Sequence, residues 1–167
     1  MTFLFVFVSI IIVCFGFVVL RGAPYVPTRK RQIQQAFDEL YVVGKKDVVV
    51  DLGSGDGTLL REAAKRGASA IGYELNPILV IVSKLISYSQ KSVKIKWADF
   101  WQKQLPDEAT VVYIFINTKD TKHMKRFLET HVKRTKKDLS VISYAFMLPN
   151  MPPQKTVGPM HLYTFKA

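Results

Sequence analysis

The sequence contains one cysteine and three histidines, and no charged residue lies among its first 20 positions. Because Cys14 is alone and lies within an apolar run, no disulfide can form within the chain. His123, His131 and His161 are not spaced with other donors as zinc ligands are, so we predict no metal site. Internal repeats and low-complexity tracts are also missing, which excludes a repeat architecture. A chain of 167 residues then has room for one compact domain without metal or disulfide support.

Acidic side chains are scarce. The chain has 13 Asp and Glu against 24 Lys and Arg, which gives a net charge of +11. Such a surplus favours attraction to anionic lipid headgroups or to an acidic partner. A nucleic acid would explain the same bias, but we do not expect one as the partner.

Residues 3–20 form one long apolar run, FLFVFVSIIIVCFGFVVL. As a helix this run would be ~27 Å long, close to the hydrocarbon thickness of a bilayer. We therefore predict a lipid-embedded transmembrane anchor over residues 1–21. A cleaved signal peptide is the alternative, but it would need a basic start and a small-residue cleavage site. Positive charges follow the run at Arg21, Arg29, Lys30 and Arg31. This flank predicts a single-pass protein whose catalytic domain lies on the cytoplasmic or mitochondrial matrix side.

We divide the remainder into a linker with an N-terminal helix, residues 22–47, and a domain, residues 48–167. Apolar spacing predicts the N-terminal helix over residues 29–40, with Thr28 as its cap.

Strand and helix patterns alternate within the domain. Strands are predicted at 48–52, 70–75, 93–97, 110–116 and 139–146, and helices at 58–66, 77–89 and 118–132. Two short extended pieces, 154–157 and 161–166, flank a Gly-Pro turn and predict a closing hairpin. This order predicts an α/β, Rossmann-like fold with a mostly parallel sheet and a C-terminal antiparallel hairpin, preceded by one transmembrane helix.

A glycine-rich turn follows the first predicted strand, in the stretch VVVDLGSGDGT. In an open α/β sheet, ligands bind at this end of the strands. Gly53 and Gly55 would let the backbone approach a ligand closely. A dinucleotide site would need a third glycine at position 58, where Thr58 stands.

Charge separates the two cofactor classes further. Asp51 and Asp56 would place carboxylates around a pyrophosphate, which is unfavourable. They suit a cation, and S-adenosylmethionine carries both an ammonium and a sulfonium. We therefore favour S-adenosylmethionine, with Asp51 receiving its amino acid portion.

Acidic residues also end the next two predicted strands. Glu74 is placed to accept from both ribose hydroxyls, a role that carboxylates also have in NAD sites. Asp99 could accept from the adenine amino group while its neighbour Phe100 packs on the ring. Three carboxylates that end three successive strands favour a class I methyltransferase.

Three stretches, VVVDLGSGDGTLL, GYELNP and the upstream PYVPT, resemble the mitochondrial protein-lysine methyltransferases that modify the ATP synthase c-subunit and the adenine nucleotide translocase, with their prokaryotic relatives. The resemblance implies cofactor-binding roles for Asp51, Gly53, Gly55, Glu74 and Asp99, a place on the adenosine side for Asn76, and positions over the cofactor or substrate entrance for Tyr25 and Thr28. The chain departs from that family after the fourth strand, where FINTK matches no substrate motif that we can align. It also lacks the Asn-Pro-Pro-Tyr of many amine methyltransferases.

Aromatic side chains could form the walls of an acceptor pocket, because they hold a methylated ammonium by cation–π contact. Candidate walls are Tyr25, Trp101, Tyr144 and Phe146. No general base stands out, so we assign no catalytic residue. We expect N-methylation of a lysine on a membrane-associated protein. The alternatives are methylation of a lipid or small amphiphile, and a membrane-bound module that binds S-adenosylmethionine or a nucleotide without turnover.

Overall fold

The computed structural model of the chain describes residues 1–21 and 28–167, without the side chains of residues 10, 11, 14 and 17–21. Tyr25, one of the expected entrance residues, lies outside the described residues. A single mixed sheet of seven strands forms the centre of the domain, in the order β3-β2-β1-β4-β5-β7-β6.

Five strands of this sheet are parallel to one another. They are β1 (Val48–Leu52), β2 (Ser69–Glu74), β3 (Val93–Trp97), β4 (Val111–Ile114) and β5 (Leu139–Tyr144). The last strand, β7 (Met160–Phe165), pairs antiparallel with both β5 and β6 (Lys155–Val157). The prediction of a mostly parallel sheet with a closing antiparallel hairpin is confirmed.

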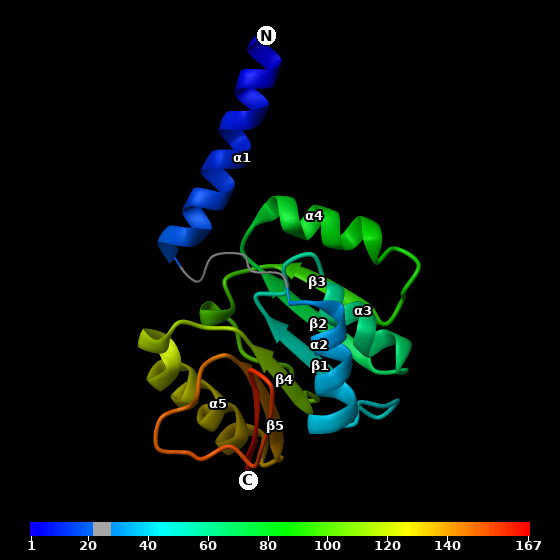
Figure 1. Ribbon diagram of the computed structural model, residues 1–167, viewed down its shortest axis with the longest axis vertical. Helices are drawn as coiled ribbons and strands as arrows, with labels where there is room; N and C mark the ends of the chain where they lie inside the picture. Colours follow the sequence, from blue (N-terminus) through cyan, green and yellow to red (C-terminus); the bar gives the residue numbers. More distant parts are fainter. Residues whose placement is uncertain (22–27) are drawn as a thin grey trace.

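Helices cover both faces of the sheet (Figure 1). One face carries α2 (Lys30–Gln35), the π-helical turn η1 (Ala36–Leu40) and α3 (Thr58–Lys65), whose apolar side chains share a core with β1, β2 and β4. The other face carries α5 (Thr121–Thr135), which packs on a second core. The remaining elements are α4 (Pro77–Ile86) and two short 3-10 turns, η2 (Phe100–Gln102) and η3 (Thr118–Asp120). The carboxyl ends of the parallel strands β1, β2 and β4 lie side by side at the same end of the sheet, between the two helical layers.

The structure corrects the prediction that Thr28 caps the N-terminal helix. That helix begins at Lys30, its cap residue is Arg29, and no side chain caps it. The hydroxyl of Thr28 instead lies 3.3 Å from the hydroxyl of Tyr113 in β4, 85 residues away. A contact at this sequence separation gives no signal in local helix patterns. The predicted helix over 77–89 is also shorter, because α4 ends at Ile86.

Helix α1 (Thr2–Arg21) contains 20 residues and extends away from the domain, with the N-terminus at its far end (Figure 1). Near the domain it contacts α4. Its described apolar side chains are largely exposed, Phe3 at 93% and Phe5 at 77%. The structure does not support the predicted transmembrane span: over the residues it describes, no helix meets the length and apolarity needed to cross a membrane.

Candidate functional site

The turn between β1 and α3 contains three glycines in backbone conformations that other residues rarely adopt. Gly53, Gly55 and Gly57 all have positive φ, at 98°, 54° and 79°. A side chain at Gly57 would be strained by this φ and would also collide with α4, because its Cβ would lie 2.2 Å from Oγ of Ser83. Glycine therefore lets the turn pack against α4 at this position without strain and without displacing Ser83.

Glu74, at the end of β2, holds this turn in place. One carboxylate oxygen accepts a hydrogen bond from the backbone N–H of Gly55 at 2.8 Å, and the other accepts from the N–H of Asn76 at 2.7 Å. The side chain is buried. Each carboxylate oxygen can accept a second hydrogen bond, so Glu74 can fix the turn and still receive hydroxyl groups of a ligand.

Asp51, in β1, lies beside Glu74 without a hydrogen bond or ion pair to any residue that the structure describes. Its side chain faces the same side of the sheet as Tyr113, its register partner in β4. Burial, together with the negative charges of Glu74 and Asp56, raises the pKa of the Asp51 carboxyl to about 8. A buried acid with a strongly shifted pKa and no protein cation beside it is typical of a binding site for a positively charged group.

Three more buried polar groups near the turn have no partner among the described residues: Oγ of Ser54, Oγ of Ser83 and Nδ2 of Asn76. The side-chain oxygen of Asn76 does have a role, since it accepts from the N–H of Ile78 at 3.0 Å and caps α4. Because buried donors normally find acceptors, the amide N–H2 of Asn76 is available to a ligand at the end of β2.

Asp56 is engaged differently. Its two carboxylate oxygens accept from the backbone N–H and the hydroxyl of Thr58, at 3.0 and 2.9 Å, and Arg61 lies 3.8 Å away. These contacts stabilise the first turn of α3. Toward the site, Asp56 contributes negative charge next to Asp51.

The segment after β3 carries Asp99, Phe100 and Trp101. One oxygen of Asp99 accepts from the N–H of Trp101 at 3.1 Å and so begins η2. Phe100 is half-buried, and its ring centroid lies 4.7 Å from that of Trp101. Trp101 stacks on His123 at 4.3 Å and meets Phe127 edge-on, so it packs against α5.

An aromatic cluster follows the carboxyl ends of β4 and β5. The Phe115 ring lies 5.6 Å from that of Tyr144 and 6.2 Å from that of Phe146. The hydroxyl of Tyr144 donates to the side-chain oxygen of Gln32 on α2 at 3.4 Å. The structure thus brings together two of the four aromatic residues predicted from the sequence and places Trp101 elsewhere.

Sequence reasoning missed Tyr113 and Phe115. Tyr113 is buried, and burial raises its pKa while the hydroxyl of Thr28 lowers it in part. A tyrosine inside an apolar strand has the sequence pattern of a core residue, so no local signal marks it. Phe115 directly follows β4, and that position beyond a strand end was a usable signal.

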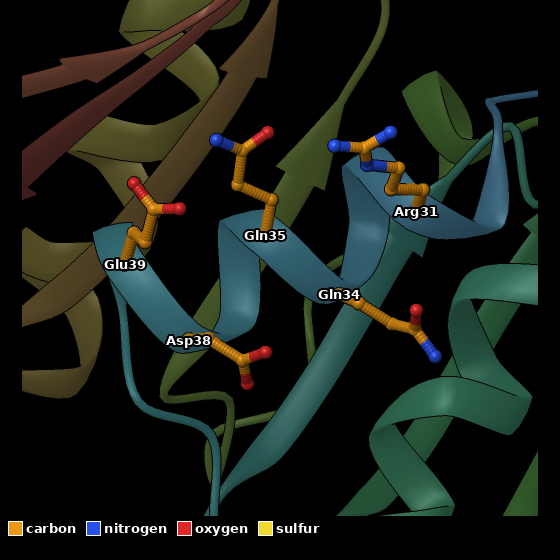
Figure 2. A pocket seen from close by; sticks show the side chains of 5 residues that line it. All are labelled: Arg31, Gln34, Gln35, Asp38 and Glu39. Atoms are coloured by element: carbon orange, nitrogen blue, oxygen red, sulfur yellow. The ribbon is translucent and has the colours of Figure 1, made fainter.

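A separate hollow of about 290 Å³ lies along α2 and η1. Figure 2 shows the five side chains that line it: Arg31, Gln34, Gln35, Asp38 and Glu39. None of the predicted cofactor or substrate residues lines this hollow, and two of its side chains are engaged in fixing α3, since Gln34 donates to Glu62 and Asp38 pairs with Arg66. It is therefore a surface depression apart from the candidate site.

A parallel sheet with a glycine turn after β1 and carboxylates at the ends of β1 and β2 defines the class of Rossmann-like, S-adenosylmethionine-dependent methyltransferases. Within that class, the family described as the ANTKMT methyltransferase domain matches residues 51–155, and the chain belongs to this family.

Similar proteins agree with this assignment. The chain is 32% identical over 138 residues to the ATP synthase c-subunit lysine N-methyltransferase of Homo sapiens, across 81% of this chain and 57% of that protein. It is 31% identical over 140 residues to a protein-lysine N-methyltransferase of Saccharolobus islandicus (strain REY15A), across 80% of this chain and 83% of that one. Among solved structures, an RNA methyltransferase from Salinibacter ruber, in complex with S-adenosyl-L-homocysteine, matches with a TM-score of 0.76 and 26% identity, across 84% of this chain and 94% of that chain. The chain thus spans little more than half the length of the human relative.

Proposed function

We propose that this chain is an S-adenosylmethionine-dependent protein-lysine N-methyltransferase. The observation that carries the proposal is the buried Asp51 carboxylate, unpaired among the described residues and adjacent to Glu74 at the carboxyl end of the sheet. The names of the human and the S. islandicus relatives support lysine as the acceptor. The S-adenosyl-L-homocysteine bound in the S. ruber structure supports the donor.

The residues at the strand ends fit the groups of this donor. Asp51 suits the ammonium of the amino acid portion, because a nearby cation would offset the cost of its buried charge. Glu74 suits the ribose hydroxyls, and Asp99 with Phe100 suits the adenine ring. Donor-binding roles are thus proposed for Asp51, Gly53, Gly55, Asp56, Glu74, Asn76, Asp99 and Phe100.

S-adenosylmethionine, when bound, supplies a methyl group on a positively charged sulfur. With this donor held by the strand-end residues, a neutral lysine amine would form the new nitrogen–carbon bond while the electron pair of the carbon–sulfur bond would remain with the donor sulfur. The methylated ammonium would then lose a proton to water. Since this displacement needs an aligned nucleophile more than a general base, the contribution of the chain is to position both reactants.

The aromatic cluster after β4 and β5 suits the acceptor amine. Phe115, Tyr144 and Phe146 are half-buried, and aromatic faces attract a methylated ammonium. Thr28 and Tyr113 join the segment that precedes α2 to β4, next to Asp51. We propose that these residues lie on the acceptor side of the site, together with Tyr25. Trp101 stacks on His123 of α5, so we propose that it would affect the acceptor side only indirectly, by holding α5 in place.

The test is methyl transfer from labelled S-adenosylmethionine into membranes and total protein from the source cells. We expect protein-bound label that is sensitive to protease, and mass increments on lysine. Label that follows the lipid extract would identify a lipid methyltransferase, and label released by ribonuclease would identify the RNA activity that the S. ruber neighbour suggests. Donor binding without transfer to any fraction would identify a non-catalytic module.

Two variants sharpen this test. Asp51→Asn keeps the size of the side chain but removes its charge, so it should abolish transfer. Asp38→Asn is the matched control, because Asp38 is exposed on η1 and pairs only with Arg66 among the described residues. Equal activity of the two variants would refute the assignment of the donor site.

We further propose that α1 attaches the domain to a membrane and that the substrate is associated with the same membrane. The support is an uncharged apolar run of 18 residues within a 20-residue helix whose described side chains are mostly exposed. The basic residues that follow it favour a domain on the cytoplasmic or matrix side. The expected result is that the full chain floats with vesicles and resists extraction by alkaline carbonate. Extraction by carbonate would contradict insertion of α1.

A further inference from the structure

Helix α4 is apolar on the side that faces solvent as well as on the side that faces the sheet. Its sequence is PILVIVSKLI, in which only Ser83 and Lys84 are not apolar. Leu79 and Val80 are buried against the domain. Ile81 and Leu85, on the outer side, are 58% and 71% exposed. A helix that is apolar all round is normally covered on all sides, so this outer side lacks a partner among the residues that the structure describes.

The exposed surface continues beyond the helix. Ile86 and Tyr88 follow Leu85 along the chain at 54% and 91% exposure. Trp97, at the end of the edge strand β3, is 67% exposed, and its indole N–H donates to the carbonyl of Leu75 just before α4 at 3.0 Å. Scattered exposed apolar residues are ordinary, but a group on one helix and its neighbouring strand marks a contact surface. We name this group the α4 face: Ile81, Leu85, Ile86, Tyr88 and Trp97.

The charged residues on α4 and on the segment that follows it are all lysines. From residue 75 to residue 98 the chain contains four lysines and no acidic residue. Lys84 on α4 and Lys91 just after it border the face, and both are exposed. Lys94 and Lys96 are exposed too, but they alternate with Val93 and Ile95 in β3 and point to the other face of this edge strand, where Lys96 lies over the Tyr73 ring. Apolar side chains bordered by lysines, with a tyrosine and a tryptophan among them, have the composition of a surface that lies in the headgroup region of an anionic bilayer.

The position of α1 agrees with this composition. Helix α1 contacts α4, and α4 lies across the end of the domain from which α1 extends (Figure 1). A membrane that received α1 would therefore meet the α4 face first. We propose that the α4 face docks on the surface of an anionic bilayer and so fixes the orientation of the domain; this inference rests on the proposed attachment through α1.

Two other occupants fit less well. A second copy would bring identical lysines together across the contact, and like charges at an interface repel. Helix α1 itself contacts α4, yet Ile81, Leu85 and Tyr88 stay exposed in its presence. An anionic bilayer satisfies both the apolar side chains and the lysines.

Trp97 provides a direct probe, since the chain has only two tryptophans. In the full chain with Trp101→Phe, Trp97 is the sole tryptophan, and its fluorescence can be read in vesicles of phosphatidylcholine with phosphatidylglycerol that carry bromine near the headgroup end of the acyl chains. We expect strong quenching by the brominated lipid and protection from aqueous iodide. Neutralising Lys84 and Lys91 to glutamine should shift the docked fraction toward the undocked state by about fivefold for each lysine.

A matched pair of variants tests the face itself. Ile81→Asn with Leu85→Asn should reduce lipid quenching of Trp97 strongly. Val42→Asn should not, because Val42 is even more exposed, at 79%, but lies before β1 and outside the α4 face. Flotation with vesicles measures membrane attachment through α1 separately in every sample. Chains that float while Trp97 remains open to iodide would overturn the inference and leave the attachment through α1 intact. Protection of Trp97 that appears in detergent without lipid and rises with protein concentration would identify a second copy and also overturn it.

Discussion

Binding of the methyl donor at neutral pH should release a proton from this protein. The source is Asp51, whose pKa is raised to about 8 by burial and by the nearby negative charges of Glu74 and Asp56. Without ligand the carboxyl is therefore mostly protonated at pH 7. Once a cationic ammonium lies beside it, the charged form is favoured and the proton leaves.

The expected number of protons follows from these pKa values. With a pKa of about 8, Asp51 is about 90% protonated at pH 7 and about 10% protonated at pH 9. The α-amino group of the donor has an ordinary pKa of about 7.7–8.0, so it takes up about 0.1–0.2 proton at pH 7 and about 0.9 at pH 9 when it binds as a cation. Net release should then be about 0.7–0.8 proton at pH 7, and net uptake about 0.8 at pH 9.

Calorimetry in two buffers with different enthalpies of ionisation measures this number directly. The wild-type chain should change from release to uptake near pH 8, whereas Asp51→Asn should bind weakly and show uptake at both pH values. Asp38→Asn should behave as the wild type. Net uptake by the wild type at pH 7 would refute the reasoning, because it would mean that Asp51 is already charged or does not meet the ammonium.

Four further outcomes are expected. Gly57→Ala should lower the free energy of unfolding by about 1–3 kcal/mol, because position 57 has a positive φ and the new Cβ would collide with Oγ of Ser83. Adding Ser83→Ala should restore part of this free energy in urea denaturation, since Cβ of Ser83 is 3.5 Å away. An equally unstable double variant would contradict the collision. Glu62 is buried and accepts from Lys65 at 2.7 Å and from Gln34 at 3.1 Å; these partners lower its pKa against the opposing effect of burial. Glu62→Gln should therefore destabilise the domain by about 1–2 kcal/mol at pH 7. The difference in stability from the wild type should shrink as the pH falls below the ordinary pKa range of a glutamate. Without donor, the stability of the wild type should fall as the pH rises from about 4 to about 8, because native Asp51 retains a proton that the unfolded chain has lost, and Asp51→Asn should remove that slope in urea titrations across this range. Tyr144→Phe should keep most of the lysine methylation rate and Tyr144→Ala should lose it about tenfold or more; equal rates for the two would exclude an aromatic wall at this position.

The strand and helix pattern of the domain could be predicted because each element carries its own signal. β1 is apolar except for Asp51, Gly67 with its positive φ follows the end of α3, and Asn76 with Pro77 begins α4. The closing hairpin was also predictable, from two extended pieces around Gly158. These signals lie within a few residues of the element that they define, so they can be recognised in the sequence without knowledge of the tertiary contacts.

The contacts that complete the candidate site could not be predicted in the same way. Threonine often caps helices, but the hydroxyl of Thr28 lies within hydrogen-bond distance of the hydroxyl of Tyr113 in β4. This partner lies 85 residues away, so the local sequence pattern does not reveal it. Asp56 accepts from Thr58 two residues on, and its role beside the donor stays a prediction. The proximity of Asp51 to Glu74 was predictable, because parallel strands bring their carboxyl ends to one edge.

The short connection between α1 and Thr28 limits how far the domain can lie from the end of α1. Seven peptide steps join Arg21 to Thr28, and an extended chain covers at most ~3.3–3.6 Å per step, so the two residues cannot be more than ~25 Å apart. Thr28 is hydrogen-bonded to the strand that lies next to Asp51. Whatever holds the end of α1 therefore also limits how far the proposed methyl-transfer site can lie from that point, and under the proposed function a target amine has to come within that distance.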